Sequence, residues 1–142
     1  MRNQKFDDHE KDEFLEDSYE YIARYFDGSL QELSERNLHI KVRFKRLSET
    51  SFASYIYDNG ERVAQCAIWY GQSHFGSQGI VYSNSVEVGH SYNESLRVID
   101  DGYTLQLESQ GFHRGMHNYD NALSKQGAAE YLWSILVSPL QE

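Results

Sequence analysis

The stretch LHIKVRFKR, residues 38–46, alternates apolar and basic residues. A period of two is typical of a β-strand with one buried face. We expect one face to hold Leu38, Ile40, Val42 and Phe44, and the other to hold His39, Lys41, Arg43 and Lys45. The second face therefore concentrates positive charge in a chain whose net charge is -9.

Charge is distributed unevenly along the chain. Residues 1–37 hold eleven acidic and five basic side chains, residues 38–70 hold three and five, and residues 71–142 hold eight and three. The acidic total argues against nonspecific binding of DNA or RNA, because affinity for phosphates depends on cations that displace counterions. The total favours basic or neutral partners, while the basic strand itself suits a small anion or an acidic protein segment.

Length and composition predict a single globular domain over residues 1–142. Cys66 is the one cysteine of the sequence, so no internal disulfide can form. No basic N-terminal patch is followed by an apolar run, and the apolar runs are too short to span a bilayer. These features predict a cytoplasmic protein with no membrane partner.

Helical signals lie at both ends of the chain. Asp7 and Glu10 form the pattern of a capping box, and apolar residues follow at helical spacing. We expect Asp27-Gly28 to interrupt this helix and Ser29 to begin a short second one. A C-terminal helix is predicted over residues 124–137, ended by Ser138-Pro139.

Two dipeptides, Asn59-Gly60 and Asp101-Gly102, suit two-residue hairpin turns. Regular pairing from the first turn would put Tyr55 and Tyr57 on one face with Cys66, and from the second would place Val98 opposite Leu105. The six expected strands cover residues 38–46, 51–57, 62–70, 79–86, 95–99 and 103–109. We therefore predict an α+β fold with a mainly antiparallel meander sheet and both terminal helices on one sheet face.

The basic strand face is the first candidate site. Its side chains stand about 6–7 Å apart along the strand, a spacing that suits an extended acidic segment. The candidate partner- or anion-binding residues are His39, Lys41, Arg43, Lys45, Tyr55, Tyr57, Trp69 and His74. The alternative interpretation is a solvated edge strand whose cations discourage edge-to-edge pairing and have partners in the acidic N-terminal helix.

Two other classes of site remain open. The loop YGQSHFGSQG, residues 70–79, could surround a small anion such as a nucleotide with His74, although its spacing matches no phosphate-binding motif. His113 and His117 stand four residues apart, as in a metal-assisted hydrolase, but Arg114 occupies the place of the motif glutamate.

Nucleophilic chemistry has little support. Cys66 lies among apolar residues of an expected strand, where a thiol is usually buried and unreactive. The sequence therefore predicts no cofactor and favours a non-catalytic binding or regulatory module, acting on a protein partner or a second copy through an open sheet face. A bacterial toxin or defence setting is one context for such a module.

Overall fold

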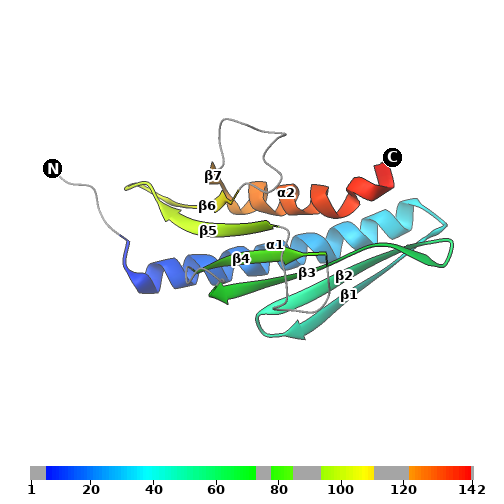
Figure 1. The fold of residues 1–142 in the computed structure, drawn as a ribbon, viewed down its shortest axis with the longest axis horizontal. Coiled ribbons are helices and arrows are strands. Elements are labelled where there is room, and N and C mark those ends of the chain that lie inside the picture. Colours follow the sequence, from blue (N-terminus) through cyan, green and yellow to red (C-terminus); the bar gives the residue numbers. More distant parts are fainter. Residues whose placement is uncertain (1–5, 73–77, 85–93, 111–121, 142) are drawn as a thin grey trace.

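The computed structural model describes residues 6–72, 78–84, 94–110 and 122–141, and it confirms the α+β class (Figure 1). A long helix comes first, the strands of a sheet follow, and a second helix with a short 3₁₀ helix comes after them. The elements are α1 (Asp8–Arg36), β1 (Ile40–Ser48), β2 (Ser51–Asp58), β3 (Glu61–Gln72), β4 (Gln78–Ser83), β5 (Glu94–Asp100), β6 (Leu105–Ser109), β7 (Ala122–Leu123), α2 (Lys125–Val137) and the 3₁₀ helix η2 (Ser138–Gln141).

The described strands form one sheet in the order β1-β2-β3-β4-β5-β6-β7, and every neighbouring pair is antiparallel. This is the predicted meander, in which each strand pairs with the next along the chain. The sequence predicted about six strands, and the two-residue β7 adds a seventh to the described sheet at the β6 edge. No helix in the described part of the chain is long and apolar enough to cross a membrane.

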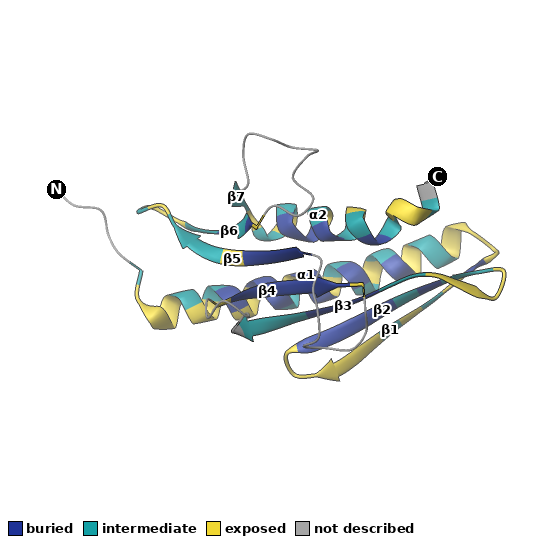
Figure 2. Ribbon diagram, viewed as in Figure 1, coloured by how far each residue is buried: buried dark blue, intermediate teal, exposed yellow. Residues whose placement is uncertain are grey.

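Both helices pack on the same face of the sheet, as predicted. A row of directly paired residues crosses the sheet and marks this inner face: Phe52, Ile68, Tyr82 and Glu94. The rings of Tyr19 and Phe26 on α1 lie 5.8 and 5.6 Å from the ring of Phe52, measured between centroids. Tyr131 of α2 donates its hydroxyl to Glu94. Buried residues accordingly gather between the sheet and the two helices (Figure 2).

The N-terminal helix begins where the sequence predicts. Glu10 N–H donates to the Asp7 side chain at 2.8 Å, and Asp7 N–H donates to the Glu10 side chain at 2.9 Å. The predicted break at Asp27-Gly28 was wrong, because α1 continues through it for 29 residues. Phe26 and Leu30 are both fully buried on either side of the glycine. Their packing on the sheet stabilises a helical turn that the local sequence only weakly favours.

Replacing Gly28 by alanine should raise the free energy of unfolding by about 0.5–1 kcal/mol. Gly28 is exposed in mid-helix, and an added Cβ would have no atom within 4 Å. The substitution therefore reduces the conformational freedom of the unfolded chain without disturbing a contact. Urea unfolding followed by circular dichroism measures the change, and a lowered stability would show that the helix needs glycine at this position.

The first hairpin departs from its predicted register because of a β-bulge. Near the turn, Tyr57 pairs with Arg62 as expected, but Ile56 then pairs with Ala64, so Val63 is the extra residue. Each residue of β3 after the bulge is displaced by one position relative to regular pairing. Cys66 consequently faces the core with Ile56, and its predicted placement beside Tyr55 was wrong.

The second hairpin has a longer turn than predicted. Val98 pairs with Leu107, and Asp100 pairs with Leu105, so the turn covers residues 101–104. The Asp101 side chain accepts hydrogen bonds from the N–H groups of Tyr103 and Thr104 at 2.9 and 2.8 Å. This displacement is two residues, so it leaves each side chain on its predicted face.

Candidate functional site

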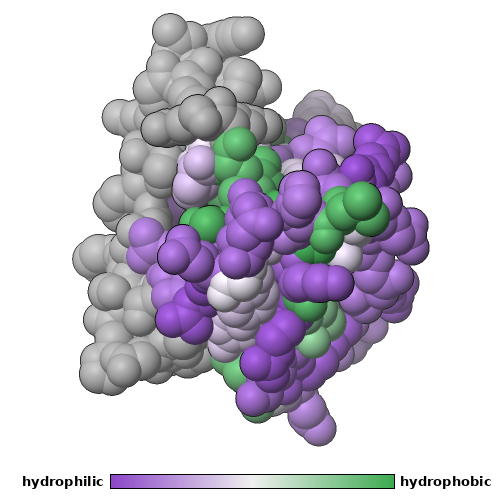
Figure 3. Space-filling view, turned by 90° about the vertical axis from the view of Figure 1, so that its right-hand side faces the viewer, coloured by the Kyte–Doolittle hydropathy of each residue, from purple (hydrophilic) through white to green (hydrophobic). Residues whose placement is uncertain are grey.

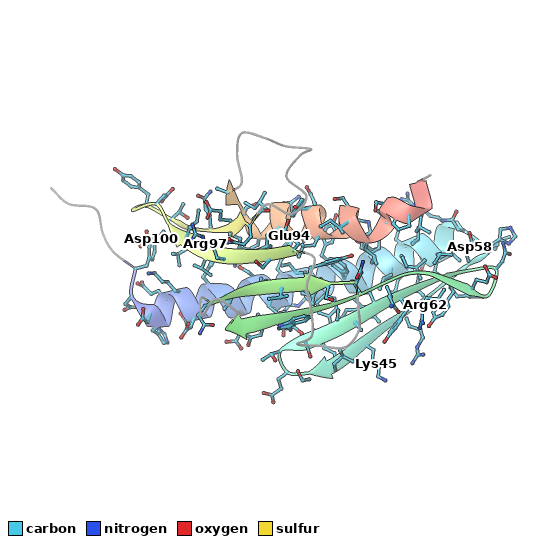
Figure 4. The ribbon with its side chains drawn as sticks, in the orientation of Figure 1. Lys45, Asp58, Arg62, Glu94, Arg97 and Asp100 are labelled. Carbon is cyan, nitrogen blue, oxygen red and sulfur yellow. The ribbon has the colours of Figure 1, made fainter. Side chains whose placement is uncertain are left out.

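The outer face of the sheet, opposite the helices, carries a cluster that we call the basic face: Lys41, Arg43, Lys45, Tyr55, Tyr57 and Arg62. Strand pairing positions them, because Lys41 is opposite Tyr57, Tyr57 is opposite Arg62, and Arg43 is opposite Tyr55. The predicted alternation of β1 is confirmed: Lys41, Arg43 and Lys45 are exposed, whereas Ile40 is buried. Figure 4 labels Lys45 on β1 and Arg62 on β3, and β2 lies between these two strands.

Two cations of the basic face share one aromatic ring. The guanidinium carbon of Arg43 lies 5.7 Å from the centroid of the Tyr55 ring, and that of Arg62 lies 6.0 Å from it. Tyr55 also stacks on Tyr57, with 6.5 Å between ring centroids. These cation–π contacts orient the guanidinium groups while leaving their N–H donors available to an incoming acceptor.

The acidic helix does not neutralise the basic face. Arg46 points to the inner face and forms an ion pair with Glu20 of α1 at 3.1 Å. Within residues 6–72, 78–84, 94–110 and 122–141, Lys41, Arg43, Lys45 and Arg62 form no ion pair. The acidic partners expected under the solvated-strand interpretation are therefore found for Arg46 and not for these four cations.

Arg62 is the member of the basic face that sequence reasoning missed. The signal was present, because a two-residue turn at Asn59-Gly60 pairs Tyr57 with Arg62 and puts both side chains on one face. Counting charges along β1 alone overlooked the cation on β3, which β2 separates from β1. Reading the hairpin register together with the charge pattern would have found it.

The remaining predicted residues are placed as follows. Trp69 lies on the outer face, opposite Ser51 and Val81, and is half-buried. Leu38 and His39 lie in a turn before β1, so their assignment to the strand was wrong. Leu38 is 91% exposed, because the chain is still leaving α1 at that point and has not reached the sheet.

The outer face is only partly open. Ala53, Ala67 and Val81 belong to it by register, yet all three are buried. The accessible region of the outer face therefore consists of β1 and the parts of β2 and β3 that carry Tyr55, Tyr57 and Arg62.

The end of the molecule where α1 ends and β2 turns into β3 is mainly hydrophilic, and hydrophobic side chains appear there as separate areas (Figure 3).

A second polar cluster is buried between the sheet and α2. The carboxyl group of Glu94 accepts hydrogen bonds from Ser95 N–H at 2.9 Å, from the Ser109 hydroxyl at 3.1 Å and from the Tyr131 hydroxyl. Glu94 has no exposed surface and lies at the start of β5, with its side chain bonded to Tyr131 of α2 (Figure 4). These bonds connect β5, β6 and α2, so the cluster serves the packing of the helix on the sheet.

The cysteine thiol is suited to packing. Cys66 is completely buried, and burial raises the pKa of its thiol to about 12. At neutral pH the thiol is protonated, and a thiol in that state is a poor nucleophile. Burial likewise raises the pKa of Tyr19 to about 12, although nearby Arg46 opposes this shift.

The other two candidate sites fall on residues that the structure leaves out. His74, His113 and His117 lie outside the described residues, so the small-anion and metal sites stay predictions. Within the described ranges, no three histidine, cysteine, aspartate or glutamate side chains are grouped to hold a metal ion.

Comparison with known proteins identifies the family and gives no activity. Residues 41–138, which run from β1 into η2, match the model of the Y4lF protein domain. A protein of Sinorhizobium fredii (strain NBRC 101917 / NGR234), named "Uncharacterized protein y4lF", is 40% identical over 136 residues. That alignment covers 96% of this chain and 42% of the relative, so the chain spans less than half of the relative's length. No solved structure matches the chain. Because the domain match includes most of the sequence, the chain belongs to the Y4lF protein domain family.

Proposed function

We propose that this chain is a non-catalytic binding module that recognises an acidic protein partner through its basic face. The observation that carries the proposal is the row of Lys41, Arg43 and Lys45, exposed on the face away from α1 and without an ion pair among the described residues. Arg62 extends the positive charge across β2 to β3. Cations grouped in this way attract an acidic surface and set its orientation.

The chemistry of the basic face suits carboxylates on a protein. Adjacent outward side chains on a strand are about 6–7 Å apart, which matches alternate acidic residues of an extended segment. Tyr55 and Tyr57 add half-buried aromatic area, and tyrosine is enriched in protein interfaces. The net charge of -9 would repel a long nucleic acid from the rest of the molecule.

A double charge reversal, Lys41→Glu with Arg43→Glu, should weaken partner binding at least tenfold without lowering the melting temperature. Both side chains are exposed, so the fold does not depend on them, whereas an acidic partner would meet two like charges. The matched control is Arg24→Glu with Arg36→Glu, which makes the same change in net charge on exposed positions of α1.

The measurement compares three tagged proteins, wild type and both double variants, in capture from lysate of the source cells. A captured protein that only the Lys41/Arg43 variant loses is then purified, and its dissociation constant is measured for all three forms by calorimetry. Equal affinity of the three forms would contradict the proposal. Light scattering of the same samples tests whether the partner is a second copy, in which case the reversal would abolish a dimer.

A further inference from the structure

The strand that carries the basic face is also an edge of the sheet. Among the strands that the structure describes, β1 pairs with β2 alone, and the other edge is the two-residue β7. An edge strand presents backbone N–H and C=O groups that can pair with one more strand. β1 is nine residues long, so the edge is long enough to hold an extended segment.

The pairing of β1 with β2 shows which backbone groups of β1 are directed away from β2, towards the open edge of the sheet. Asn59 N–H donates to His39 C=O at 3.0 Å, which makes this pair a hydrogen-bonded one. In an antiparallel ladder such pairs alternate, so Lys41, Arg43 and Lys45 bond to β2, and Val42, Phe44 and Arg46 direct their backbone groups away from it.

Hydrogen bonds from the described part of the chain reach the backbone groups of only part of this edge. Ile40 N–H donates to Asn37 C=O at 3.1 Å, and Ile40 C=O accepts from the Ser34 hydroxyl at 3.2 Å. Between the described residues, no hydrogen bond involves the outward backbone groups of Val42, Phe44 or Arg46. The free edge thus begins at Val42 and lies directly beside the three exposed cations.

Charge decides what can occupy the edge. If a second copy paired its β1 with the β1 of the first copy, the inner faces of the two sheets would lie on the same side. Lys41, Arg43 and Lys45 of one copy would then lie opposite the same cations of the other copy. Like charges directly opposite each other destabilise a strand pair. An extended segment with acidic residues at alternate positions would instead place each carboxylate next to a cation.

We infer that the partner of the basic face docks by adding an acidic strand to β1, antiparallel to it, so that the sheet gains one strand. The inference rests on the proposed function and specifies its partner. Non-acidic residues of the docked segment exchange backbone hydrogen bonds with Val42, Phe44 and Arg46. Its acidic residues project to the outer face, next to Lys41, Arg43 and Lys45.

The test uses the wild-type protein and blocked nine-residue peptides in which threonine and glutamate alternate. One peptide is unmodified, a second carries N-methyl groups on the threonines, and a third carries them on the glutamates. In the docked arrangement the threonine N–H groups face β1 and the glutamate N–H groups face solvent. Fluorescence anisotropy should show at least tenfold weaker binding for the threonine-methylated peptide and less than threefold weakening for the glutamate-methylated one.

The outcomes separate this inference from the proposed function. Equal binding of the three peptides would overturn strand addition, because contacts with side chains alone do not depend on peptide N–H groups. Absence of binding by the unmodified peptide at millimolar concentration would also overturn it. Both results leave the basic face available to a folded acidic partner, which the double charge reversal tests independently.

A change in the protein provides a second measurement. Val42→Pro removes an N–H group that is directed away from β2, and proline is tolerated in edge strands at such positions. Val42→Ala is the control for the lost side chain. We expect proline to weaken binding of the unmodified peptide at least tenfold relative to alanine, with both variants folded by circular dichroism. The same affinity for the two folded variants would contradict strand addition.

Discussion

Replacing Phe52 by alanine is expected to lower the free energy of unfolding by about 3–5 kcal/mol. Phe52 is fully buried at the centre of the inner face, and its ring lies 5.1 to 5.8 Å from the rings of Phe44, Phe26 and Tyr19, between centroids. It therefore joins β1, β2 and α1 in one core. Truncation would remove these contacts and leave a cavity that surrounding strands and helix cannot fully close.

Urea unfolding of Phe52→Ala, followed by far-ultraviolet circular dichroism, measures this effect. The matched control is Phe44→Ala, because Phe44 is only half-buried and should cost clearly less. Phe52→Leu keeps most of the volume and should retain most of the stability. A loss below about 1 kcal/mol for Phe52→Ala would show that α1 does not depend on this contact for its position.

Replacing Gly79 by alanine is expected to lower the free energy of unfolding by about 1–3 kcal/mol. Gly79 is buried in β4, opposite Arg97 of β5. An added Cβ would overlap the backbone carbonyl oxygen of Leu96, which cannot rotate away as a side chain could. Relief would require the two strands to separate locally, at the cost of their hydrogen bonds.

Gly28→Ala is the matched control for Gly79→Ala, because the chemical change is the same and the expected sign is opposite. The glycine in α1 has open space around it, and the glycine in β4 has a backbone oxygen in the way. Thermal and urea unfolding of the two variants should therefore shift in opposite directions. If both substitutions lowered the stability to a similar extent, the loss at Gly79 could not be assigned to the close approach of β4 and β5.

Local patterns predicted those features that depend on neighbouring residues. The alternation in residues 40–45 indicated both faces of β1, since a strand has a period of two whatever surrounds it. Asp7 and Glu10 indicated the start of α1, because the capping box closes within four residues. Asn59-Gly60 indicated the β2–β3 turn, where Asn59 and Gly60 both have positive φ.

The candidate site was predicted in part for the same reason. Lys41, Arg43 and Lys45 could be assigned to one face from their own strand alone. Arg62 belongs to that face only through pairing across β2, and it was overlooked. The buried state of Ala53 and Ala67, which limits the open area, depends on contacts that no strand pattern specifies.

The sequence by itself determined the class of fold, the order of its elements and the sign of charge on the outer side of β1, because periodicity, caps and turns act over a few residues. Tertiary structure alone decided that α1 continues past Gly28, where burial of Phe26 and Leu30 outweighs the weak helix propensity of glycine. It also decided the bulge at Val63, which turns Cys66 into the core. Both features arise because the free energy of packing between distant segments exceeds the small local preferences that a sequence pattern records.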